Sequence, residues 1–146
     1  MGFVPKNAEW YLAEIVEELT VVDDPRNVVW RNLTLVHANS PDEAYEHALQ
    51  LGRLGDTEYM NSAGKLVTTR FRGLSFLDVV HDPLEHGAEL MFRSSVGVSP
   101  DDLHKLLRSK EELELFLPIS SAHGPDVAAG EIVQELEERF GIKRTE

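Results

Sequence analysis

The chain has no cysteine among its 146 residues. This absence excludes disulfide bonds, a catalytic thiol and any metal site built from thiolates. Hydrophobic residues nevertheless make up 42% of the chain, which is enough to form a packed core. We therefore expect one domain, or one domain followed by a C-terminal extension.

Basic residues are also few: 14 lysines and arginines stand against 26 aspartates and glutamates, so the formal net charge is -12. A surface of this sign repels phosphate backbones, and we predict that the protein does not bind nucleic acid. An acidic surface is instead suited to a basic protein partner. An immunity or inhibitor protein that neutralises a basic toxin or nuclease is a special case of this hypothesis.

Long hydrophobic runs and targeting signals are missing as well. No stretch approaches the roughly 18 apolar residues of a membrane span. The segment from Met1 to Lys6 lacks the basic start and the apolar run of a secretory signal. We expect a cytoplasmic protein with no membrane partner. The nucleophile elbow, the phosphate loop and the dinucleotide fingerprint are all absent, so we predict no catalytic residues and no cofactor.

The segment Ser40-Pro41-Asp42-Glu43-Ala44 has the features of a helix start. Ser40 is suited to the N-cap and Pro41 to the first helical position, while Glu43 completes a Ser-x-x-Glu capping box. The amphipathic pattern that follows predicts a helix to about Leu51. Gly52 and Gly55 are expected to end this helix in conformations with positive φ.

Strand patterns occur on both sides of this helix. They predict strands at residues 10–17, 28–36, 57–60 and 65–72, and a last strand at residues 88–94. Gly73 is expected to break the fourth strand. The apolar segment from Leu74 to Val80 fits either a continuation of that strand or a short helix. The first two strands carry apolar residues on both faces, which predicts that both faces of the sheet are covered.

The predicted fold class is therefore α+β: an antiparallel sheet of about five strands in the order β-β-α-β-β-β, with one helix packed on a face. We place this domain at residues 1–96 and a helical C-terminal extension at residues 97–146. Ser99-Pro100 repeats the cap signature, and a final amphipathic helix is expected to begin at Asp126. The extension packs either on its own domain or on a partner subunit, and the sequence leaves both options open.

An ordered series of residues also resembles a known family. The series is Trp10-Tyr11 at the first strand, Ser40-Pro41-Asp42-Glu43-Ala44 at the helix, Tyr59, Asn61 and Gly64, Phe71 with Gly73, and Gly87 with Glu89. Between about Trp10 and Phe92 the chain resembles a mainly bacterial family of unknown activity, domain of unknown function 4288. The resemblance implies a small α+β domain and implies no activity.

Two groups of residues are candidates for a site. The first is a speculative ligand-binding set on predicted strands: Glu14, Arg70, Arg72, Glu89 and Arg93. A buried carboxylate in this set could act as an acid or base, and its arginines could hold a carboxylate or phosphate group. Cross-strand ion pairs on a half-solvated face are the simpler interpretation.

The second group is a weaker metal hypothesis at Asp78, His81 and His86, with Asp82 and Glu85 nearby. Imidazole and carboxylate groups bind zinc, iron or manganese. The two histidines are five residues apart and not four, so a helix would not place them together, and Pro83 favours a loop. A polar turn is the favoured interpretation.

The leading functional hypothesis is a non-enzymatic protein-interaction module, either a homodimer or a binder of another protein. It rests on the missing catalytic motifs, the apolar residues on both strand faces and the amphipathic tail. The alternative is a small-ligand or enzymatic site around Glu14, Arg70, Glu89 and Arg93.

Overall fold

The computed structural model describes residues 3–118 and 124–129 of the chain. These residues belong to two compact units. The first unit comprises the described residues up to Met91 together with residues 124–129, and the second comprises residues 92–118. The predicted domain boundary after residue 96 stays a prediction.

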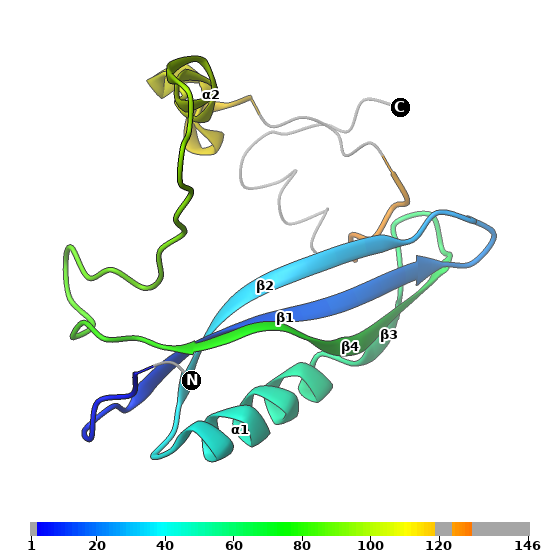
Figure 1. Ribbon diagram of the computed structural model, residues 1–146. Coiled ribbons are helices and arrows are strands. Elements are labelled where there is room, and N and C mark those ends of the chain that lie inside the picture. The colour runs from blue at the N-terminus through cyan, green and yellow to red at the C-terminus, as the bar shows by residue number, and fades with distance from the viewer. Residues whose placement is uncertain (1–2, 119–123, 130–146) are drawn as a thin grey trace. The chain divides into compact units, whose positions relative to one another are not determined.

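The first unit contains an antiparallel sheet of four strands and one helix, which confirms the predicted α+β class. The strands are β1 (Trp10–Val21), β2 (Val28–His37), β3 (Thr57–Met60) and β4 (Leu66–Val79), in the spatial order β2-β1-β4-β3. Helix α1 (Pro41–Leu54) follows β2 and lies along one face of the curled sheet (Figure 1). The long strands β1 and β4 form the centre, and β2 and β3 form the two edges.

The strand predicted at residues 88–94 is wrong, because this segment forms no strand in the structure. The apolar segment after Gly73 instead continues β4 to Val79, so that one strand of 14 residues spans the whole length of β1. Gly73 does not break the strand. It lies at a β-bulge with a φ of 145°, a conformation that glycine alone adopts readily.

Helix α1 begins as predicted and ends later. The Ser40 hydroxyl accepts a hydrogen bond from the Glu43 amide at 3.1 Å. The Glu43 carboxylate accepts from the Asn39 amide at 3.4 Å and not from the Ser40 amide, so the second half of the predicted capping box does not form. Gly52 lies inside the helix, and the C-cap at Gly55 has a φ of -77°, so the predicted positive-φ ending is wrong. Gly52 is buried because the Phe71 ring of β4 packs directly against it.

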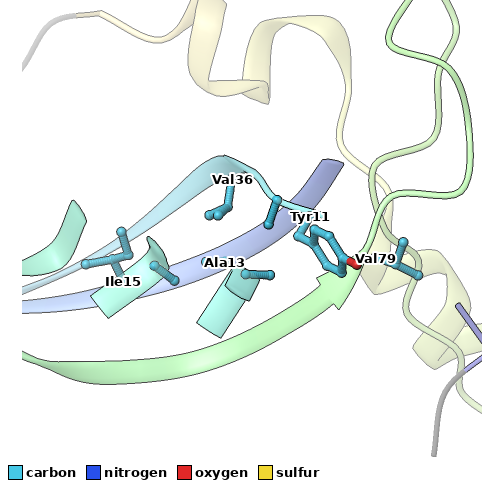
Figure 2. Close-up of a cluster of buried hydrophobic side chains, with 8 residues drawn as sticks. Tyr11, Ala13, Ile15, Val36 and Val79 are labelled. Carbon is cyan, nitrogen blue, oxygen red and sulfur yellow. The ribbon is translucent and has the colours of Figure 1, made fainter. Parts of the chain in front are cut away.

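The core lies between α1 and the sheet. Tyr11, Ala13 and Ile15 alternate along β1 and point to the same side as Val36 of β2 and Val79 of β4 (Figure 2). Ala44 and Ala48 of α1 are fully buried against this cluster. Small side chains on the helix let its backbone approach the sheet closely, because a larger residue there would have no free volume to occupy.

A second cluster extends the same face beyond the end of α1. Leu19, Val21 and Val67 are buried there, and Tyr59 and Val127 pack against them. Residues 124–129 reach this cluster from the C-terminal part of the chain: the Tyr59 hydroxyl donates to the Val127 carbonyl, and Asn61 forms an isolated bridge with Ala129. The final helix predicted from Asp126 does not start there, and its continuation after Ala129 lies outside the described residues.

The docking of residues 124–129 can be tested by titrating Tyr59. Burial raises the pKa of this phenol above its usual 10.0, and the negative charge of Asp126 raises it further. The raised pKa contributes stability below pH 10 that is lost as the pH rises through the folded-state value. The difference in tyrosinate absorbance between the wild type and Tyr59→Phe reports the ionisation of Tyr59. We expect this difference to titrate with a midpoint above pH 10, and we expect Asp126→Asn to lower that midpoint. A difference that titrates at or below pH 10 would contradict the docking.

The second unit contains the short helix α2 (Pro100–Leu106) and the 3-10 turns η1 (Lys110–Glu112) and η2 (Glu114–Phe116). The predicted cap at Ser99 is confirmed, since its hydroxyl accepts from the Asp102 amide at 3.2 Å. Ser109 and Glu112 form a capping box at η1. No residue of these three elements is buried.

Candidate functional site

The face of the sheet opposite α1 carries both polar and apolar candidates. Because side chains alternate along a strand, residues between the core positions point to this face. They include Leu12, Glu14, Val16 and Glu18 of β1 and their register partners Leu35, Leu33, Arg31 and Val29 of β2. Leu12 and Glu14 are buried, whereas Val29, Leu33 and Leu35 are 52%, 57% and 39% exposed. The predicted covering of both faces is therefore incomplete over the described residues.

Glu14 is the central polar residue of this face. Its carboxylate accepts a hydrogen bond from Nε of Arg31 at 2.6 Å and another from Oγ of Ser75 at 2.5 Å. The Glu14 side chain is only 10% exposed, whereas that of Arg31 is 64% exposed. The Glu14 carboxylate is thus mostly buried, whereas the Arg31 guanidinium that donates to it remains exposed to solvent. This exposure weakens the attraction between the two charges.

Two β-bulges in β4 bring further side chains toward the glutamates of β1. The register slips once between Glu14 and Ile15 and again between Val16 and Glu17, which leaves Ser75 and Arg72 as the extra residues of β4. Ser75 reaches Glu14, and Arg72 donates from Nε and Nη2 to Glu18 at 3.0 and 2.8 Å. A bulge redirects a side chain in this way because two residues oppose one on the neighbouring strand.

The arginines predicted as ligand-binding residues are already paired with carboxylates. Arg72 pairs with Glu18, and hydrogen bonds from Asn27 and then from Arg72 hold the pKa of Glu18 below its usual value. Arg70 pairs with Glu58 of β3 at 3.0 Å. These exposed cross-strand pairs contribute little to stability. They also occupy the guanidinium groups that a ligand carboxylate or phosphate would need.

The other two members of the predicted ligand set do not lie on the sheet. Glu89 is exposed in the segment after β4, where its amide donates to Asp82 at 2.9 Å. Arg93 belongs to the second unit. Both were assigned to the sheet through the strand predicted at residues 88–94, which does not form. Of the five residues, the structure therefore places Glu14, Arg70 and Arg72 on the sheet.

The residues of the metal hypothesis are exposed and do not converge. Asp78 accepts from the Val79 amide at 2.8 Å, and the His81 ring stacks on Phe3 with a centroid distance of 6.3 Å. His86 is exposed in the following turn. Over residues 3–118 and 124–129, no three histidine or carboxylate side chains gather in a way that could hold a metal ion.

The feature that the sequence analysis missed is the edge of β2. The Ala38 amide donates to the Glu9 carbonyl at 3.0 Å, and in the β1–β2 register these two residues face each other. Hydrogen-bonded pairs alternate along antiparallel strands, so every second residue of β2 forms backbone hydrogen bonds to β1. Counted back from Ala38, these residues are Val36, Thr34, Asn32, Trp30 and Val28. The residues between them point their N–H and C=O groups away from the sheet. We call Val29, Arg31, Leu33 and Leu35 the open edge.

At the C-terminal end of β2, next to the open edge, helix α1 bonds to the strand backbone. His47 Nδ1 lies 2.7 Å from the His37 carbonyl and donates to it, since a carbonyl can only accept. A cleft of about 410 Å³ lies between β2 and α1, and its lining residues include Trp10, Leu35, Leu51 and Leu54. The open edge and this cleft are continuous through Leu35.

In a comparison with known protein families, residues 10–92 match the model of the domain of unknown function 4288 (DUF4288). The chain belongs to the DUF4288 family. The DUF4288 region contains all four strands and α1, and therefore the whole of the open edge. Comparisons with curated proteins and with solved structures gave no match.

The DUF4288 assignment confirms the resemblance seen in the sequence, and with it the α+β domain that the resemblance implied. The family description names no activity, so any function has to be argued from the site itself. Within the part of the chain that the structure describes, none of the helices has the length and apolar character needed to cross a bilayer.

Proposed function

We propose that this protein is a non-enzymatic protein-interaction module that binds an extended segment of a partner protein along the open edge of β2. Strand addition of this kind uses main-chain hydrogen bonds for affinity and alternate side chains for specificity. The observation that carries the proposal is the coincidence, at Val29, Leu33 and Leu35, of exposed apolar side chains with backbone groups that pair with no strand among the described residues.

The alternative of a small-ligand or enzymatic site has less support. Such a site needs several polar groups that converge in a cavity. Glu14 is buried, but Arg70 and Arg72 are directed to Glu58 and Glu18, and Glu89 lies outside the sheet. An acidic inhibitor of a basic protein would dock through carboxylates, and β2 contains none. The open edge therefore favours an apolar strand as the partner.

The proposal can be tested with a displayed library of short, unstructured peptides. The wild-type chain would be immobilised at low density, so that two copies cannot meet, and compared with Leu33→Pro and Met60→Lys. Proline at residue 33 removes an outward N–H that is not used by β1, and edge strands tolerate such a residue. Met60 is 54% exposed on β3 at the opposite edge of the sheet, so its replacement removes an exposed apolar side chain outside both the open edge and the cleft beside it.

We expect the wild type and Met60→Lys to enrich peptides with alternating apolar residues, and Leu33→Pro to retain them at least about tenfold less well. Circular dichroism of each variant checks that the fold is kept. The proposal is wrong if no peptide is enriched on the wild type, or if Leu33→Pro retains the same peptides equally well while folded.

A further inference from the structure

The two edges of the sheet differ in how they are protected. Edge strand β3 has four residues, and short edges are a common protection against strand pairing. Edge strand β2 has 10 residues, and it contains no proline, lysine, aspartate or glutamate. Its pairing with β1 also shows no bulge, unlike that of β4 with β1. Over the residues that the structure describes, β2 is thus a long, regular and apolar edge without the usual devices that block another strand.

We propose that β2 pairs antiparallel with β2 of a second copy of this chain. This inference rests on the proposed function and identifies the strand that the open edge accepts. The charge distribution favours a second copy: the chain has a net charge of -12, yet β2 carries no carboxylate and its Arg31 is paired with Glu14. Two acidic copies can therefore meet along β2 without placing carboxylates of that strand against each other.

The open edge also fixes the register of the pairing. A twofold axis at Asn32 places Val29 opposite Leu35 of the second copy and Arg31 opposite Leu33. All four residues of the open edge then form backbone hydrogen bonds to the second copy. An axis at Arg31 would put two like charges directly opposite each other, which is destabilising. An axis at Leu33 would pair Val29 with His37, whose carbonyl already accepts from His47.

The same register accounts for the exposed Trp30. This side chain is 43% exposed and lies on the α1 side of the sheet, because the residues of β2 alternate and Val36 points into the core. With the axis at Asn32, Trp30 of the second copy stands opposite Thr34. It then lies beside the cleft of about 410 Å³ between β2 and α1. By symmetry each copy offers one tryptophan and one apolar cleft, as an isologous interface requires.

The absence of cysteine allows a direct test by single-cysteine cross-linking of the full chain. In the proposed register Asn32 faces itself as a non-hydrogen-bonded pair, whose Cα atoms are about 4.5 Å apart and within disulfide range. We expect Asn32→Cys to form a covalent dimer under mild oxidation. Thr34→Cys alone should not, whereas a mixture of Thr34→Cys and Trp30→Cys should, because these two positions face each other.

Sedimentation of the full chain supplies an independent readout. We expect a concentration-dependent dimer of the wild type that Leu33→Pro weakens at least about tenfold and that Met60→Lys leaves unchanged. Trp30→Ala should weaken it as well, if the cleft receives the tryptophan. Circular dichroism of the variants excludes unfolding as the cause of a loss.

Each other outcome overturns the inference. A monomeric wild type, or a dimer that Leu33→Pro does not weaken, shows that β2 does not pair with itself. Cross-linking of Asn32→Cys with Thr34→Cys, and not of Asn32→Cys with itself, shows that the register is wrong. If the chain is monomeric and the library still yields peptides that depend on Leu33, the proposed function stands and the second copy is not the partner.

Discussion

Replacing Gly52 by alanine is expected to lower the free energy of unfolding by about 1 kcal/mol, although alanine is the better helix former. Gly52 lies in the interior of α1, so the change alone would stabilise the helix by about 0.8–1 kcal/mol. A Cβ at this position would, however, overlap the Phe71 ring, with Cζ only 2.8 Å away and two further ring carbons closer still.

The overlap cannot be relieved cheaply. Phe71 packs against the main core cluster from β4, so a shift of its ring would disturb contacts with the buried residues of the sheet. Overpacking of this kind costs about 1–3 kcal/mol, which exceeds the gain in helix propensity. The destabilisation of Gly52→Ala can be measured by urea denaturation, with Gln50→Ala on the exposed side of α1 as the control.

A double-mutant cycle identifies the cause. In a Phe71→Leu background the ring is gone, so Gly52→Ala should cost less than in the wild type and could stabilise the helix. If Gly52→Ala is equally destabilising in both backgrounds, contact with Phe71 is not the reason for the glycine.

Gly52 also illustrates what a local sequence pattern predicts and what it does not. The cap at Ser40 and the start of α1 at Pro41 depend on neighbouring residues, and both were predicted correctly. The function of Gly52 depends on Phe71, which is far away along the chain, and a glycine near a helix end therefore suggested a C-cap. Gly73 was misinterpreted for the same reason, because its bulge exists only through the pairing of β4 with β1.

The candidate site shows the same division between local and long-range information. Glu14 was recognised as a carboxylate in a strand, but its partners Arg31 and Ser75 come from the two neighbouring strands. The open edge could not be predicted because it depends on strand order, which places β2 outside β1. The sequence did contain one signal that was not used: the 10 residues of β2 include no carboxylate in a strongly acidic chain.

Leu19 and Leu33 are leucines in different environments. Comparing their alanine variants separates an effect on folding from an effect on binding. Leu19 of β1 is fully buried beside Val21 and Val67, whereas Leu33 of β2 is 57% exposed. Truncation of a buried leucine leaves a cavity, and we expect Leu19→Ala to lower the free energy of unfolding by about 3 kcal/mol. Leu33→Ala should change it by less than about 0.5 kcal/mol at concentrations where the chain is monomeric. Chemical denaturation of both variants measures these values.

The exposed leucine should then show its effect only when β2 has a partner. At high protein concentration Leu33→Ala is expected to weaken the dimer, because the proposed register places Leu33 opposite Arg31 of the second copy, while Leu19→Ala should leave the dimer of the folded fraction unchanged. A large loss of stability for Leu33→Ala at low concentration would instead assign Leu33 to the core. Since an exposed leucine stabilises a monomer little, a loss confined to the dimer would mark the open edge as a binding surface.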